Sequence, residues 1–151
     1  MTVHFLDTSA WAKLYVQEPG SSWLARWSAT SPALVVSSLA LIELLATLSR
    51  RRADATLPPP RFEDLYRMAL DDASHGPILH FDGDVFELAI NLPIHVPLRG
   101  ADTVQLASLL LLRARMQEEG EEVVLVSSDR TLNDYAIAEG VRVIDPVENE
   151  D

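Results

Sequence analysis

The segment that most constrains the fold is residues 3–11, where a short apolar run ends at a carboxylate and a helical pattern begins directly after it. Residues 3–6 have the character of a strand, Asp7 follows them, and Trp11 belongs to the helical pattern. A strand that turns at once into a helix is typical of α/β proteins, which bind ligands at the carboxyl ends of their strands. We therefore expect Asp7 to lie on that rim of a sheet.

Four further short apolar runs alternate with helical patterns along the rest of the chain. They cover residues 33–36, 78–81, 123–126 and 141–144. The run at 123–126 contains no polar residue, which is typical of a strand that is buried on both faces. Residues 54–60, which end in three consecutive prolines, predict a loop between two of the helices, with Pro60 suited to the start of the second. The alternation predicts an α/β domain with a mainly parallel sheet.

Length and composition limit the possible classes of protein. The chain has 151 residues, 48% of them hydrophobic, so we expect residues 1–151 to form a single domain with a real core. It contains no cysteine, which excludes disulfides, thiolate zinc sites and cysteine nucleophiles. No segment approaches the roughly 20 apolar residues of a membrane helix, so we expect a cytoplasmic protein with no membrane partner.

The net charge restricts how the chain could act on a nucleic acid. The formal charge is −11, from 12 basic and 23 acidic residues, which is the wrong sign for binding a polyanion by charge alone. Part of the excess lies in a turn at 118–122 and in the tail at 148–151, both of which we expect to be solvated. A function on nucleic acid would therefore require a local source of positive charge.

A bound metal cation could supply that positive charge. Four acidic residues are candidates for binding one: Asp7, Glu43, Asp102 and Asp129. Singly, each has an ordinary explanation, since an acid can cap a helix, favour its dipole or begin a solvated stripe. Jointly, two acids at strand ends and two on helices that lean over the same rim would concentrate negative charge. Close carboxylates raise one another's pKa unless a cation compensates them, and an all-oxygen site suits Mg²⁺ or Mn²⁺. Such an ion could activate water for attack on a phosphodiester.

With these residues assembled, the sequence resembles PIN-domain proteins, and specifically the VapC toxins of bacterial type II toxin–antitoxin pairs. Four stretches carry the resemblance: residues 5–10, 38–43, 98–107 and 126–132. It implies a PIN-like three-layer α/β/α fold with a central sheet in the order 3-2-1-4-5 and helices on both faces. It also implies an RNA substrate, a homodimer and inhibition by a cognate antitoxin protein.

The same resemblance implies a Mg²⁺-dependent endoribonuclease, with Mn²⁺ as a possible substitute. The acidic site would consist of Asp7, Glu43, Asp102 and Asp129, supported through hydrogen bonds by Thr8 or Ser9 and by Ser127. Many relatives carry His where this chain has Gln105, so we assign no role to a histidine there. The polar side chain of Gln105 could still form hydrogen bonds beside Asp102.

Basic residues offer possible contacts to RNA. Arg50 and Arg51 could bind a phosphate backbone or oppose the C-terminal dipole of their helix, and both interpretations stay open. Arg99, which precedes Asp102, is a third possible RNA-binding residue.

Two other function classes compete with a nuclease. One is a non-catalytic protein-interaction module that keeps the fold, which the strong negative charge favours. The other is a phosphotransfer or phosphatase domain with Asp7 as nucleophile. A common form of the latter has a second Asp two residues on, where this chain has Ser9, and a receiver domain has a Lys where this chain has Asp145 and Pro146.

Overall fold

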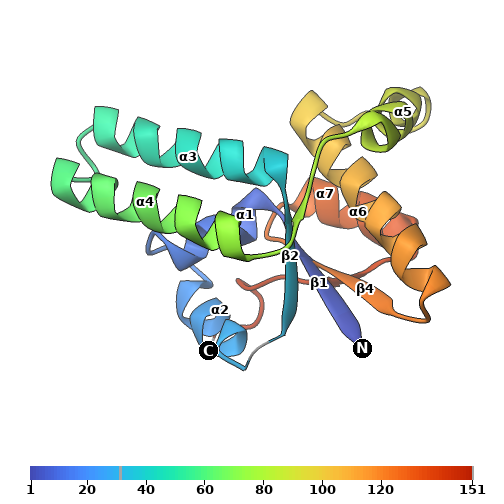
Figure 1. The fold of residues 1–151 in the computed structure, drawn as a ribbon, viewed down its shortest axis with the longest axis horizontal. Coiled ribbons are helices and arrows are strands. Elements are labelled where there is room, and N and C mark those ends of the chain that lie inside the picture. The colour runs from blue at the N-terminus through green and yellow to red at the C-terminus, as the bar shows by residue number, and fades with distance from the viewer. Residues whose placement is uncertain (31, 151) are drawn as a thin grey trace.

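A five-stranded parallel sheet forms the centre of the molecule, as Figure 1 shows from one side. The computed structural model describes residues 1–30 and 32–150. The strands are β1 (Thr2–Leu6), β2 (Ala33–Ser37), β3 (Ile78–Leu79), β4 (Glu122–Val126) and β5 (Arg142–Ile144). Their order across the sheet is β3-β2-β1-β4-β5, and every neighbouring pair is parallel. The predicted parallel sheet and its order are both confirmed.

Helices connect consecutive strands. They are α1 (Thr8–Trp11), the 3₁₀ turn η1 (Ala12–Leu14), α2 (Ser21–Ser28), α3 (Ser38–Ala53), α4 (Pro59–His75), α5 (Gly83–Asn91), the 3₁₀ turn η2 (Leu92–Ile94), α6 (Gly100–Glu118) and α7 (Arg130–Ala138). Figure 1 shows α3 and α4 lying side by side as a long hairpin, with α5 and α6 on the other side of the strand ends. A loop does separate α3 from α4, but it is shorter than predicted: Pro59 and Pro60 form the first turn of α4, where the missing amide of proline costs no helical hydrogen bond.

Alternation along the central strands separates two hydrophobic cores. In β1, Phe5 packs into a core with α6 and α7, whereas Leu6 packs into a core with α1 to α4. In β4, Leu125 and Val126 divide between the same two cores. All four side chains are fully buried. Because successive residues of a strand face opposite sides, this division places helices on both faces and confirms the three-layer arrangement.

The ends of the elements follow local chemistry. Ser37 caps α3, with its hydroxyl accepting a hydrogen bond from the Ala40 amide at 3.0 Å, and Asp82 caps α5. The strand expected at residues 78–81 is shorter, because the amide of Phe81 donates to the Ser38 hydroxyl at 3.0 Å. That contact turns the chain away from the sheet before α5 begins.

In the ranges that the structure describes, no helix is both long enough and apolar enough to cross a membrane.

Candidate functional site

Asp7 lies at the carboxyl edge of the sheet, as the sequence predicted. Leu6 pairs with Val126 in the register of β1 and β4, and the Asp7 amide donates to the Val126 carbonyl at 3.2 Å. The residues that follow these two strands, Asp7 and Ser127, are therefore neighbours. The Asp7 residue is only 5% exposed.

The environment of Asp7 disfavours its charged form. Burial raises the pKa of the Asp7 carboxyl to about 6, and the negative charge of Asp129 acts in the same direction. Hydrogen bonds to Asp7 Oδ1 from the Ser9 hydroxyl at 2.7 Å and the Ala10 amide at 3.2 Å oppose the rise. The carboxylate is thus capped on one oxygen and still lacks full compensation of its charge.

Three serines connect Asp7 to Asp129. Ser9 Oγ accepts a hydrogen bond from the Ser128 amide at 2.9 Å and lies 3.4 Å from Ser127 Oγ. Ser127 Oγ accepts one from the Asp129 amide at 3.0 Å, and Asp129 in turn caps α7. The hydroxyls predicted to support the site therefore join the two loops that carry its acids.

Glu43, on α3, is held from two other elements. The Thr8 hydroxyl donates to Glu43 Oε2 at 2.6 Å, and Gln105 Nε2 donates to the same oxygen at 3.4 Å. Gln105 Oε1 accepts a hydrogen bond from the Ser37 hydroxyl at 2.9 Å. Gln105 does form hydrogen bonds at this edge, as the sequence allowed, and its buried side chain reaches Ser37, Thr8 and Glu43.

Arg99 links the remaining two acids. Its Nε donates to Asp102 Oδ2 at 3.0 Å, and a terminal nitrogen lies 3.9 Å from Asp129 Oδ2. The pKa of Arg99 is raised, chiefly by the hydrogen bond and charge of Asp102 and then by the charges of Asp129 and Glu43. Since Asp129 also acts on Asp7, the four predicted acids share one electrostatic neighbourhood.

The donor set fits a hard divalent cation. Within residues 1–30 and 32–150, no three His, Cys, Asp or Glu side chains stand in an arrangement that could hold a metal ion. The chemistry nevertheless suits one, because the available groups are carboxylate and hydroxyl oxygens and Asp7 is buried with an incompletely compensated charge. The carboxylates of Asp7, Glu43, Asp102 and Asp129 are the ones that would hold it, once their side chains rearrange around the ion.

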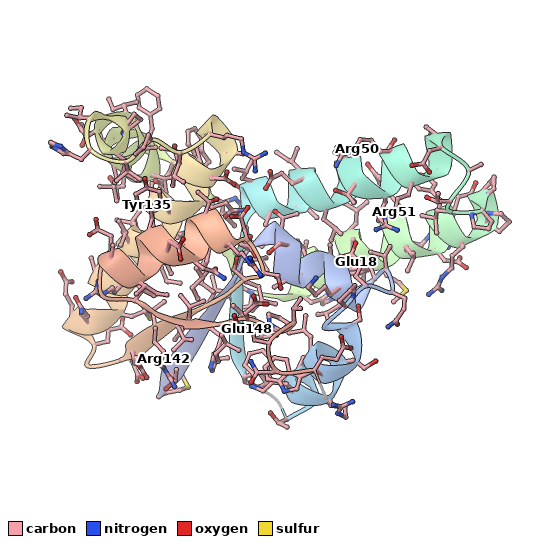
Figure 2. All side chains as sticks on the ribbon, turned by 180° about the vertical axis from the view of Figure 1, so that it is seen from behind. Glu18, Arg50, Arg51, Tyr135, Arg142 and Glu148 are labelled. Atoms are coloured by element: carbon pink, nitrogen blue, oxygen red, sulfur yellow. The ribbon has the colours of Figure 1, made fainter. Side chains whose placement is uncertain are left out.

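The two arginines at the end of α3 have different surroundings. Figure 2 shows Arg51 on the side of the helix that faces Glu18, whereas Arg50 lies on another side. Arg51 pairs with Glu18 at 2.6 Å, and Arg50 is exposed and donates to the Thr47 hydroxyl at 3.0 Å. Arg51 is thus partly neutralised within the protein, and Arg50 is the more available of the two.

Sequence reasoning missed one acid near this rim. Asp145 follows β5, and its Oδ1 accepts a hydrogen bond from the Ser128 hydroxyl at 2.7 Å. The signal was present, because Asp145 ends a strand in the same way as Asp7.

Comparisons with known proteins identify the family and the fold. A family model described as the PIN domain matches residues 4–138. No curated protein matches the sequence.

Several solved structures share the fold at low sequence identity. VapC20 from Mycobacterium tuberculosis, described as a toxin that cleaves the sarcin–ricin loop, aligns with a TM-score of 0.63 and 19% identity over 87% of this chain and 94% of its own. FitAB bound to a DNA fragment aligns with a TM-score of 0.68 and 16% identity over 98% of each chain. DNA-bound VapBC from Salmonella typhimurium aligns with a TM-score of 0.65 and 16% identity over 97% of this chain and 99% of its own. At these identities the likeness establishes the fold.

Proposed function

Because the chain belongs to the PIN-domain family, we propose that it is a metal-dependent endoribonuclease, the toxin of a type II toxin–antitoxin pair, acting in the cytoplasm. The observation that carries the proposal is the set of contacts at one edge of the sheet: Thr8 bonds Glu43, Ser9 and Ser127 lie between Asp7 and Asp129, and Arg99 reaches Asp102 and Asp129. One of these acids is buried with a raised pKa, which is typical of functional sites rather than of helix caps.

In this proposal the four carboxylates hold Mg²⁺ or Mn²⁺. When bound, such an ion activates water and stabilises the charge that develops during attack on the phosphodiester. Ser9 and the Ala10 amide fix one oxygen of Asp7, and the other oxygen would be the one to bind the cation. Thr8 does the same for Glu43. Carboxylates with one oxygen already fixed lose less freedom when an ion binds, although the acids of the described residues would still have to rearrange around it.

Arg99 and Arg50 are the side chains that we propose to contact RNA phosphates. Both are exposed, and Arg99 lies directly at the acidic edge. Arg51 is a weaker candidate, because its ion pair with Glu18 would have to open first. A few local cations of this kind offset the unfavourable net charge of the protein.

The test is cleavage of a structured RNA pool by the purified protein in Mg²⁺ or Mn²⁺, with EDTA as the metal-free control. Asp7→Asn should abolish the metal-dependent cleavage. Any cleavage left in Asp7→Asn purified identically would reveal a contaminating nuclease, and Asp134→Asn, which changes an exposed acid on α7, should retain full cleavage. Equal cleavage by wild type and Asp7→Asn would contradict the proposal.

We also propose a homodimer formed through an apolar surface, defined as Ile42, Phe81, Phe86 and Ile90. All four side chains are at least half exposed. Ile42 and Phe81 line one depression, and the rings of Phe81 and Phe86 meet edge to face at 6.3 Å. Two copies of a chain with charge −11 repel each other, so self-association has to come from apolar contact. Sedimentation of Ile42→Asp beside wild type tests this surface.

An antitoxin is the second proposed partner. FitAB and VapBC, which share the fold, are complexes of a toxin with its antitoxin. The acidic edge of this chain would attract a cationic segment of an antitoxin.

A non-catalytic interaction module is the competing function. The absence of a metal-holding arrangement in the described part of the chain, together with the pairing of Arg99 with Asp102, favours it. A Mn²⁺ titration decides between the two, because a module without catalytic function has no reason to bind the ion at millimolar concentration.

A further inference from the structure

The side chain of Gln105 connects α6 to three other elements beside the acidic edge. It is only 3% exposed. Its Oε1 accepts from Ser37 at the end of β2 at 2.9 Å, and its Nε2 lies 3.3 Å from Thr8 Oγ1 on α1 and 3.4 Å from Glu43 Oε2 on α3. A buried amide that is hydrogen-bonded at both its oxygen and its nitrogen is held in one orientation.

The orientation of this amide follows from Glu43, whose carboxylate can only accept and so faces the amino end of Gln105, and Ser37 is consistent with it. The Ser37 hydroxyl oxygen accepts from the Ala40 amide at 3.0 Å, which leaves its single hydrogen free to donate to Gln105 Oε1. The amino end of Gln105 therefore points at Glu43 and Thr8. A continuous series of hydrogen bonds runs from the first turn of α3 through Gln105 and back to Glu43 on the same helix.

Glu43 receives its donors on one oxygen. Thr8, at 2.6 Å, and Gln105, at 3.4 Å, both donate to Oε2. Neither of these donors uses the other oxygen, Oε1, which would be the one to bind a cation. An amide suits this position because it supplies a donor without charge, whereas a carboxylate would add a further negative group to a site that already contains four acids.

We propose that Gln105 is a positioning residue, which holds the carboxylate of Glu43 in the orientation that binds the divalent cation. It acts through Glu43 and Thr8 and touches neither the cation nor the RNA. This inference rests on the proposed function, because it assumes that Glu43 is a metal ligand. Groups that orient ligands typically change metal affinity by about 10- to 100-fold when they are removed.

The experiment is a calorimetric Mn²⁺ titration of the full-length chain without RNA, so that the result does not depend on cleavage. Gln105→Leu keeps a similar volume and removes both hydrogen-bonding ends. We expect it to weaken Mn²⁺ binding by about 10- to 100-fold, with partial recovery in Gln105→His, which supplies a ring N–H donor. Gln105→Met, also unable to donate, provides a second variant if Gln105→Leu does not fold.

Ser108→Ala is the matched control. Ser108 is also buried, at 2% exposure, and lies nearly one turn along the same helix. Its hydroxyl donates to the Val104 carbonyl at 2.8 Å, within α6. Its replacement removes a buried polar group away from Glu43 and should leave Mn²⁺ affinity unchanged.

A double-mutant cycle with Glu43→Gln separates positioning from general destabilisation. If Gln105 acts through Glu43, Gln105→Leu should have little further effect on Mn²⁺ affinity in the Glu43→Gln background. Equal losses in both backgrounds, or equal affinity of wild type and Gln105→Leu, would overturn the inference while the proposed function stands. Absence of Mn²⁺ binding by the wild type would overturn the proposed function itself, and the inference with it.

Discussion

Arg99 Nε donates to Asp102 Oδ2 at 3.0 Å, so one acid of the candidate site is paired with a cation from its own chain. The same guanidinium reaches to within 3.9 Å of Asp129 Oδ2. Its side chain is 82% exposed, so water and salt screen the attraction between the two charges and the ion pair is weak. The arrangement is therefore one that a divalent cation can displace, which would free Arg99 for a phosphate.

Arg99→Ala should separate RNA binding from metal binding. Loss of one phosphate contact should lower the rate of cleavage at limiting RNA and reduce the slope of log rate against log salt concentration by about 1. Mn²⁺ affinity should be unchanged or higher, because the cation that competes for Asp102 is gone. The measurements are cleavage over a salt series and a Mn²⁺ titration. Arg26→Ala, on the exposed side of α2, is the control, and a salt slope equal to that of wild type would exclude a phosphate contact.

Asp7→Asn should stabilise the metal-free protein at neutral pH. Because the folded-state pKa of Asp7 is raised from 3.8 to about 6, the folded state binds the proton more tightly than the unfolded state, and stability falls as pH rises through this window. Above it, the buried charge costs at most about 3 kcal/mol, since one pKa unit corresponds to about 1.4 kcal/mol. Asparagine removes the charge and still caps α1.

Urea unfolding in EDTA at pH 4 and pH 7.5 checks this expectation. The free energy of unfolding of Asp7→Asn should exceed that of wild type at pH 7.5, and the difference should shrink toward pH 4, where both side chains are neutral. Asp134→Asn, an exposed substitution, should show no such trend. A variant that is less stable than wild type at both pH values would show that Asp7 is well compensated in the folded protein.

The fold was largely predictable because its signals are local. Apolar runs gave the strands, and the acids that end them, such as Asp7 and Asp129, were found at the carboxyl edge as expected. The contacts of Gln105 and Arg99 were not predictable, because they depend on how α6 is rotated over the strand ends. No spacing along the chain specifies that Gln105 meets Ser37, which lies 68 positions away.

Gly20 should resist substitution more than another glycine of similar conformation. It has a φ of +90°, and an added Cβ would lie 2.9 Å from the carbonyl carbon of Pro146, in the C-terminal tail that packs on the start of α2. Gly120 has a φ of +76° and open space around it. Both alanine variants carry a backbone cost of about 1–2 kcal/mol, and only Gly20→Ala adds a steric cost of about 1–3 kcal/mol. Urea unfolding of Gly20→Ala and Gly120→Ala compares their losses in the free energy of unfolding. Equal losses would show that the C-terminal tail moves away from an added Cβ at little cost.

Tyr15→Phe should weaken the attachment of the first helical segment to α4. The Tyr15 hydroxyl, in a residue that is 7% exposed, donates to Asp72 Oδ2 at 2.5 Å. Burial and then the hydrogen bond to Asp72 raise the pKa of Tyr15, so the hydroxyl remains a donor at all working pH values. Because the partner carboxylate is exposed and can bind water instead, we expect a loss of about 1–2 kcal/mol in the free energy of unfolding.

Tyr66→Phe, a half-buried tyrosine on α4 itself, is the control for loss of a hydroxyl. In the Asp72→Ala background the effect of Tyr15→Phe should largely disappear, since its partner is already gone. If the loss persists there, the hydroxyl contributes through its burial rather than through Asp72. The segment that carries Tyr15 begins directly after Asp7, so the same variant should also lower Mn²⁺ affinity slightly if this attachment helps to hold the acidic edge in place.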